Sequence, residues 1–181
     1  MSHDDFNFEP IRGLPEQLPE GEHILWQGSP DPRRLAREAL ALRWVGGYFA
    51  LLAIWRVGVS SADFPFGVAV MHGLPFVVSG VIACAILYGI AYMQARSAVY
   101  TLTNKRVAMR IGAALTMTLN LPYVCIGTAK LDLKSSGHGT LAFELIGETR
   151  VSYLMSWPHV RPWYMARTQP ALRCIPDAEA V

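Results

Sequence analysis

The residues best suited to chemistry lie near the end of the chain, in the segment WPHVRPWYMARTQP at 157–170. Aromatic rings, an imidazole and guanidinium groups gather there, on Trp157, His159, Arg161, Trp163, Tyr164 and Arg167. Tryptophan, tyrosine and arginine contribute much of the energy at protein interfaces, because they bury large areas and form planar hydrogen bonds. We therefore predict that this cluster binds a protein partner. The alternative is that the two tryptophans only attach the loop to its own domain.

Basic residues form a second group, on both sides of the most apolar part of the chain. They are Arg33, Arg34, Arg37 and Arg43 before it, and Arg96, Lys105, Arg106 and Arg110 after it. Bases near a bilayer are attracted to anionic headgroups by about 1 kcal/mol each. We predict that they lie at a membrane surface. Recognition of one specific lipid head by the segment NKRVAMR at 104–110 is the narrower alternative.

Catalytic motifs are absent from the sequence. There is no nucleophile elbow, P-loop, dinucleotide fingerprint or HExxH segment. His138 stands between two glycines and is expected to be a solvated turn residue. The three cysteines have neither the even count nor the spacing of a disulfide framework or a zinc site. We expect a protein that is not an enzyme and has no metal site.

Two apolar segments are expected to hold these residues at a membrane. About 20 apolar helical residues cross a hydrocarbon core about 30 Å thick. Residues 73–93 meet this requirement without a charge, and residues 44–62 contain only Arg56, near the far end, where a long side chain can reach the headgroups. The connection at 63–72 has no base, so a hairpin with both termini in the cytoplasm is predicted.

Three regions follow from this reading. Residues 1–31 contain seven acidic residues and one arginine, and are expected to be extended, held at most by Phe6, Phe8 and Ile11. Residues 32–95 are assigned to an amphipathic helix, capped by Asp31 and beginning at Pro32, followed by the two spans. Small residues favour close packing of the spans on each other, on a second copy or on a client helix: Gly46, Gly47 and Ala50, and Gly80, Ala83 and Ala85.

Residues 96–181 are predicted to form an antiparallel β-domain. Apolar residues alternate along 107–111, 115–121, 131–133 and 141–145, and TNKR at 103–106 is a hairpin turn. A further strand is expected at 151–155, an irregular loop at 157–170, a last strand in ALRCI and a helix start at Asp177. Six or seven short strands indicate a β-sandwich or β-barrel. Together with the two spans, they lead us to expect that the whole chain is an α+β membrane protein.

Several segments resemble a known family. ILWQGSP, YTLTNKRVAMRIG and NLPYVCIGTAKLDL are similar to membrane-anchored bacterial pleckstrin-homology proteins. FEPIRGLPEQLPEGEHILWQGSPD and SWPHVRPWYMARTQPALRCIPDA more closely resemble photosynthetic complex assembly proteins of purple phototrophic bacteria. The resemblance implies a pleckstrin-homology-like β-domain on a hairpin in the intracytoplasmic membrane, which assembles the reaction centre with its core light-harvesting complex. A general scaffolding or lipid-sensing module is the alternative.

The resemblance also bears on cofactors. No cofactor is expected, but a neutral imidazole can ligate the magnesium of bacteriochlorophyll, and His72 lies at the non-cytoplasmic mouth of the second span. An interfacial histidine without a ligand is the simpler reading. The implied partners are the lipid bilayer, reaction-centre subunits, core light-harvesting polypeptides and a second copy of the chain, without nucleic acid.

Overall fold

The computed structural model describes residues 11–113, 116–134, 137–147 and 150–181. The chain divides into two compact units. The helical unit is Pro32–Tyr92, and the β-unit combines the residues up to Asp31 with Met93–Val181.

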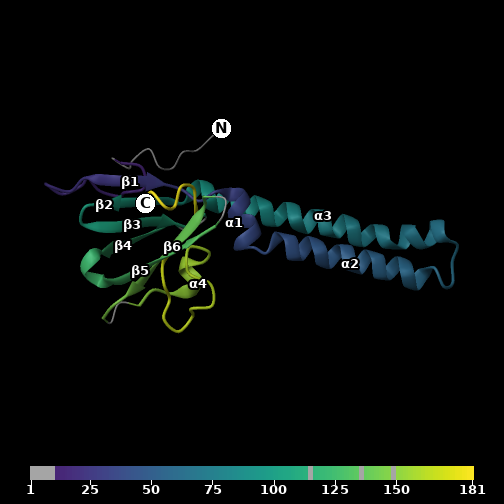
Figure 1. The fold of residues 1–181 in the computed structure, drawn as a ribbon. Coiled ribbons are helices and arrows are strands. Elements are labelled where there is room, and N and C mark those ends of the chain that lie inside the picture. Colours follow the sequence, from purple (N-terminus) through teal and green to yellow (C-terminus); the bar gives the residue numbers. More distant parts are fainter. Residues whose placement is uncertain (1–10, 114–115, 135–136, 148–149) are drawn as a thin grey trace. The chain divides into compact units, whose positions relative to one another are not determined.

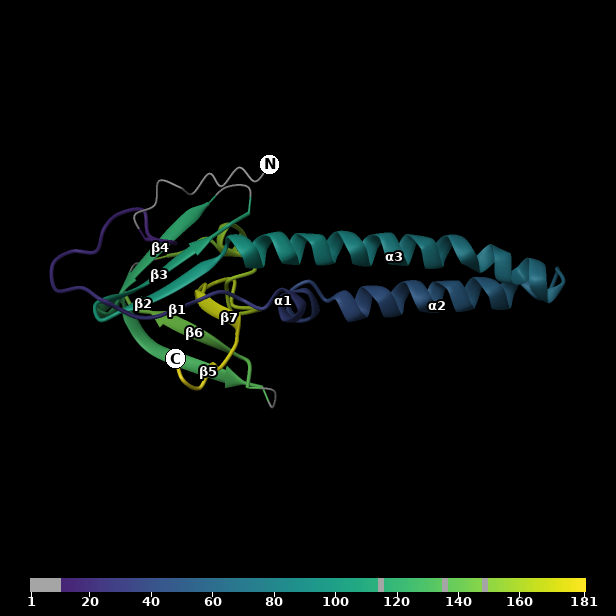
Figure 2. The same ribbon diagram turned by 90° about the horizontal axis from the view of Figure 1, so that it is seen from above.

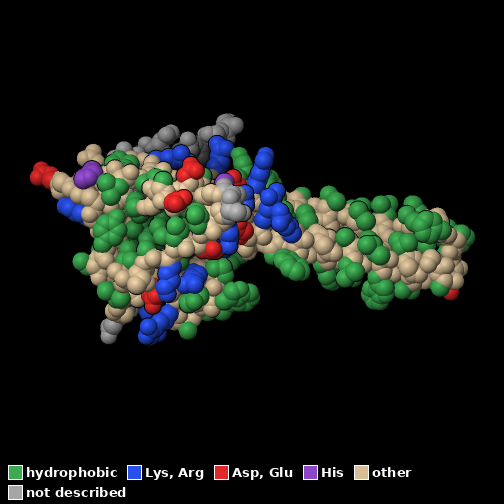
Figure 3. Space-filling model, in the orientation of Figure 1, with side chains coloured by type: hydrophobic (Ala, Val, Ile, Leu, Met, Phe, Trp, Pro, Cys, Tyr) green, Lys and Arg blue, Asp and Glu red, His purple; other side chains and the backbone are tan. Residues whose placement is uncertain are grey.

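The helical unit contains α1 (Pro32–Glu38), α2 (Leu42–Ser60) and most of α3 (Phe66–Ser97). Helices α2 and α3 are long and apolar enough to cross a membrane, by length and composition. They run side by side in both ribbon views (Figures 1 and 2). Hydrophobic side chains cover much of the visible face of this unit (Figure 3), which is a surface suited to lipid rather than water.

Glycines allow α2 and α3 to approach each other closely. A Cβ atom at Gly80 would lie 2.7 Å from Cβ of Phe49, and one at Gly73 would lie 2.6 Å from a methyl carbon of Val57. Gly46 faces Cys84 at an ordinary contact distance. The small residues predicted to pack the spans therefore do so within this unit at Gly46 and Gly80.

Two predicted boundaries in this unit are wrong. The expected loop at 63–72 is helical from Phe66, because the amides of Val68 and Ala69 bond to the carbonyl of Pro65 and start the helix directly after it. The expected amphipathic helix begins at Pro32 as predicted but ends at Glu38, and Ala41, with φ of 52°, separates it from α2.

The β-unit contains two antiparallel sheets. One has the order β1-β2-β3-β4, formed by Ile24–Gly28, Val99–Thr103, Arg106–Ile111 and Met117–Pro122. The other has the order β5-β6-β7, formed by Ile126–Leu133, Gly139–Leu145 and Ala171–Ile175. Both sheets supply the apolar core, which includes Tyr100, Met109, Ile111, Phe143 and Leu172. A short 3₁₀ helix, Tyr123–Cys125, joins the sheets, and α4 (Tyr153–Ser156) follows β6.

The acidic N-terminal segment belongs to the β-unit rather than standing apart. Strand β1 pairs with β2, and Trp26 packs against the core. Glu22 bonds to Arg106 at 2.7 Å and to the Thr103 hydroxyl at 2.8 Å. Burial raises the pKa of Glu22, but the bonds from Arg106 and Thr103 and the charge of Arg106 outweigh it and lower that pKa. Of its predicted anchors, Phe6 and Phe8 lie outside the described residues.

The C-terminal part confirms three predictions and corrects two. The turn at 103–106, the irregular loop at 157–170 and the strand ALRCI are present. The strand expected at 151–155 is instead α4, because three alternating apolar residues are too few to distinguish a strand from a helical turn. The helix expected at Asp177 is a series of turns, and Asp177 has a left-handed φ of 50°.

Candidate functional site

The predicted partner cluster does not form one surface. His159 is 1% exposed and lies in the interior of the β-unit. Trp163 is 87% exposed, and Arg167 lines a cavity. The cluster therefore contains a buried group, an exposed patch and a cavity wall, and each has a different environment.

His159 belongs to a buried polar group with Tyr100 and Arg173. Its Nδ1 lies 2.6 Å from the Tyr100 hydroxyl oxygen, which itself accepts the backbone N–H of Arg173 at 3.4 Å. Burial, together with the charge of Arg173, lowers the pKa of His159 to about 3. Burial also raises the pKa of Tyr100. His159 is therefore neutral at physiological pH and lies outside any surface available to a partner.

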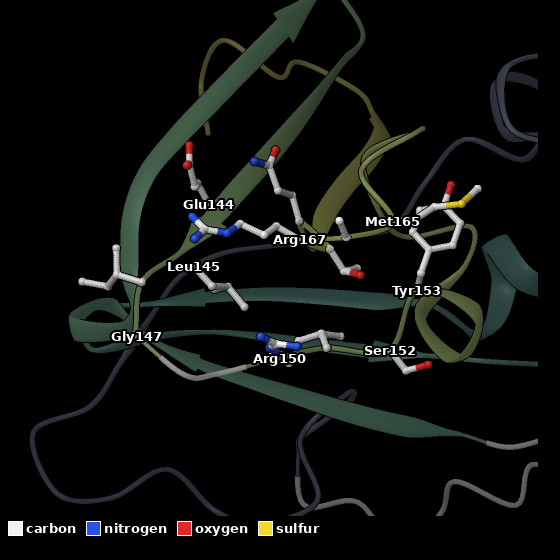
Figure 4. Close-up of a pocket in the computed structure, with 13 residues that line it drawn as sticks. Glu144, Leu145, Gly147, Arg150, Ser152, Tyr153, Met165 and Arg167 are labelled. Carbon is white, nitrogen blue, oxygen red and sulfur yellow. The ribbon is translucent and has the colours of Figure 1, made fainter.

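Apolar residues that the sequence did not single out are exposed near the exposed part of the cluster. Two segments are involved, 153–155 from α4 and 163–165 from the following loop, and Tyr153 and Met165 line the same end of a cavity. Figure 4 shows these two side chains next to each other. We call the exposed side chains of these segments the apolar patch, made of Leu154, Met155, Trp163, Tyr164 and Met165.

Backbone hydrogen bonds fix the loop that carries the patch. The amide of Arg161 bonds to the carbonyl of Gln169, and the amide of Ala171 bonds to the carbonyl of His159. The guanidinium of Arg161 donates to the Gln169 side chain at 3.1 Å and lies 4.3 Å from the centre of the Tyr164 ring. Arg161 thus positions the loop, while Trp163, with φ of 67°, lies at its exposed tip.

A cavity of about 930 Å³ lies beside the patch, within the β-unit. Its walls come from the end of β6, from residues 150–153 and from residues 165–169. Arg150 and Arg167 enter it from opposite sides, and Leu145 lies near them (Figure 4). Arg150 was missed by sequence reasoning, since a single arginine in a turn carries no signal of what the fold places opposite it.

The predicted membrane-surface bases have different environments. Arg33, Arg37, Arg43, Arg96 and Lys105 are exposed, and Arg34 and Arg106 are half-buried. Arg110 is 4% exposed, which corrects its assignment to a surface. The alternation along β3 predicted an outer face, but Ala108 and Arg110 on that face are both buried, so β3 is covered on both sides.

His72, the predicted pigment ligand, is a half-buried residue in the second turn of α3. Its Nδ1 lies 3.1 Å from the Ser60 hydroxyl, and its ring meets the edge of the Phe64 ring. Nε2 of His72 makes no hydrogen bond to another of the described residues, and it is the nitrogen that could bind a metal. In the same ranges, no group of three or more His, Cys, Asp or Glu is placed to hold a metal, and the cysteines are free thiols.

Comparisons with known proteins agree with this architecture. The bacterial PH domain family profile matches residues 40–181. A protein of Rhodobacter capsulatus, named as an uncharacterised 23.7 kDa protein in the puhA 5′ region, is 42% identical over 183 residues, which cover all of this chain and 86% of that protein. No solved structure matches significantly. Two antiparallel sheets with accompanying helices fit a pleckstrin-homology-like fold, and the chain belongs to the bacterial PH domain family.

Proposed function

We propose that this chain is a non-enzymatic membrane assembly factor similar to the photosynthetic complex assembly protein PuhB. It acts on the photosynthetic reaction centre and its core light-harvesting complex. The observation that carries the proposal is the apolar patch. Large apolar side chains that are 41% to 87% exposed on a folded domain are costly in water, and such patches mark sites of interaction. The patch therefore offers a surface to a partner rather than to solvent.

The identity of the partner rests on the relative. That protein, 42% identical over the whole of this chain, is named for its position 5′ of puhA, a reaction-centre gene. Neighbouring bacterial genes often serve one process. We therefore assign reaction-centre subunits and core light-harvesting polypeptides as the clients of the patch.

The membrane placement is part of the proposal. Helices α2 and α3 span the bacterial inner, intracytoplasmic membrane, and the β-unit and both termini face the cytoplasm. The length and composition of the two helices support the spans, and the bases on their flanks support the orientation. No cofactor is needed for this role, and bacteriochlorophyll ligation by His72 and homodimer formation stay predictions.

Binding of this kind must be differential. An assembly factor holds an incomplete client more tightly than the finished complex, since equal affinity for both would leave the client unreleased. A tryptophan buried at a contact can contribute on the order of 2 kcal/mol or more. Trp163 and Leu154, each more than 80% exposed, are the strongest candidates for such anchors.

The test combines Trp163→Ala with Leu154→Ala in a phototroph. Neither side chain supports the core, so the variant should remain in the membrane by immunoblot. Reaction-centre absorption of the membranes should fall, and antenna absorption should fall less. Val124→Ala is the matched control, because Val124 is 82% exposed on the β-unit but outside the patch.

Two outcomes would count against the assignment. Wild-type reaction-centre levels with the double variant present would show that the patch is not the client site. An equal loss with Val124→Ala would show that the effect is not specific to the patch. A general scaffolding or lipid-sensing module would then be the better description of the chain.

A further inference from the structure

The cavity next to the apolar patch has a chemistry that the proposed assembly role does not use. It lies entirely within the β-unit, with a volume of about 930 Å³. Polar and charged side chains share its walls with apolar ones. The polar and charged members are Glu144, Arg150, Ser152, Arg167, Thr168 and Gln169.

Two cations dominate this cavity. Arg150 and Arg167 are exposed and enter the space from segments that are 17 positions apart in sequence (Figure 4). Neither guanidinium makes a hydrogen bond or ion pair with another described residue. By contrast, the neighbouring Arg161 bonds to Gln169 and stacks on Tyr164. Within the part of the chain that the structure describes, the two arginines of the cavity are therefore available to an anion.

Glu144 supplies the one carboxylate among the described residues of the wall, and its main partner is Lys130. Glu144 accepts bonds from Lys130 and from the Thr128 hydroxyl, both at 3.1 Å. These bonds and the charge of Lys130 lower the pKa of Glu144, and the charge of Arg167 adds a smaller effect in the same direction. Glu144 is ion-paired with Lys130 at 3.1 Å. With Glu144 and Lys130 paired, Arg150 and Arg167 give the described part of the wall a net positive charge.

We propose that this cavity binds a phosphate group that is attached to an organic body, with Arg150 and Arg167 as its principal ligands. Guanidinium groups form paired, charge-assisted bonds to phosphate, and a phosphate has enough oxygens to engage two arginines from opposite sides. The hydroxyls of Ser152 and Thr168 on the same walls supply further donors. The proposal does not depend on the assembly role.

The remaining walls indicate what the phosphate carries. Leu145, Ile146, Val151 and Met165 line the cavity, and its volume is several times that of a phosphate ion. An organic body of mixed polarity would bury these apolar side chains, which a free inorganic ion would leave exposed. A glycerophospholipid headgroup and a soluble organic phosphate share this chemistry.

The test measures binding to the full chain in a non-ionic detergent by titration calorimetry. The probes are glycerol 3-phosphate, monomeric dihexanoyl phosphatidylglycerol and inorganic phosphate. At least one organic phosphate should bind, more tightly than inorganic phosphate does. Binding by lipid alone assigns the site to a headgroup, and binding by glycerol 3-phosphate alone assigns it to a soluble compound.

The variant Arg150→Gln with Arg167→Gln should weaken that binding by about tenfold or more, since two charge-assisted contacts are lost. The matched control is Arg12→Gln with Lys134→Gln, which removes two exposed charges from the β-unit outside the cavity and should leave affinity unchanged. Arg167→Lys keeps the charge but loses the paired geometry, and should weaken binding by less than the double variant does.

Three results would overturn the proposal. The first is the absence of binding by either organic phosphate. The second is equal binding by wild type and by the double variant, with unchanged near-ultraviolet circular dichroism. The third is binding of a glutamate-rich peptide when no phosphate binds, which would assign the cavity to a protein partner.

Discussion

Replacing His159 by asparagine should remove a pH dependence of stability that the wild-type chain has. His159 is 1% exposed, and its Nδ1 lies 2.6 Å from the Tyr100 hydroxyl oxygen. The asparagine side-chain amide can occupy nearly the same position as Nδ1 and bond to the Tyr100 hydroxyl, but it does not titrate. The substitution therefore separates the loss of a proton site from the loss of a hydrogen bond.

The size of the effect follows from the two protonation states. Burial and the charge of Arg173 lower the pKa of His159 from 6.5 to about 3 in the folded chain. Between these two pH values the unfolded chain binds more protons than the folded chain. The stability of the folded chain therefore decreases as the pH falls below 6.5, and it goes on decreasing until the pH reaches about 3. From pH 7 to pH 5 this histidine alone should cost about 2 kcal/mol of stability.

The assay is urea unfolding of the full chain in detergent, followed by near-ultraviolet circular dichroism at pH 5, 6 and 7. Other titrating groups affect wild type and His159→Asn alike, so the difference between their pH slopes isolates His159. The variant should be less stable at pH 7 and should lose about 2 kcal/mol less than wild type on going to pH 5. Parallel slopes would refute the buried, neutral His159 described above.

Two further expectations concern the helical unit. The first is tested in a chain whose native cysteines are replaced by alanine. A cysteine placed at Ser61 should react with a membrane-impermeant reagent in intact cells, and a cysteine placed at Ala113 should not react. The reverse pattern would invert the proposed topology. Gly80→Ala should lower the unfolding temperature in detergent, with a cost of about 1–3 kcal/mol, because its Cβ would lie 2.7 Å from Cβ of Phe49. Gly89→Ala should leave the unfolding temperature unchanged, because a Cβ there would meet nothing within 4 Å. Equal decreases for the two variants would exclude close helix packing at Gly80.

The sequence predicts those parts of the fold in which local pattern and tertiary environment agree. Alternation along 107–111 and 117–121 matches β3 and β4, and the charge-free run at 73–93 lies within α3. Strand β1 was missed, although Ile24 and Trp26 face inward and Leu25 and Gln27 face outward. The acidic, proline-rich composition of residues 1–31 concealed this short alternation, which only its pairing with β2 stabilises.

The candidate site was predicted in composition but not in arrangement. Residue types alone placed His159 with its neighbours at a surface, yet it lies in the core, because no local signal distinguishes a buried histidine from an exposed one. Leu154 and Met155 could have been noticed as an apolar pair beside the cluster. Arg150 could not, since its relation to Arg167 depends on how the β6 end meets the later loop.

The central claim is that the chain assembles the reaction centre, and deletion of its gene tests this most directly. The measurement is the reaction-centre absorption of membranes from the deletion strain, compared with the same strain complemented by the wild-type chain. The account predicts that deletion lowers reaction-centre absorption by a larger fraction than antenna absorption. The wild-type chain should restore the reaction-centre absorption. Unchanged reaction-centre absorption in the deletion strain would contradict the assembly role.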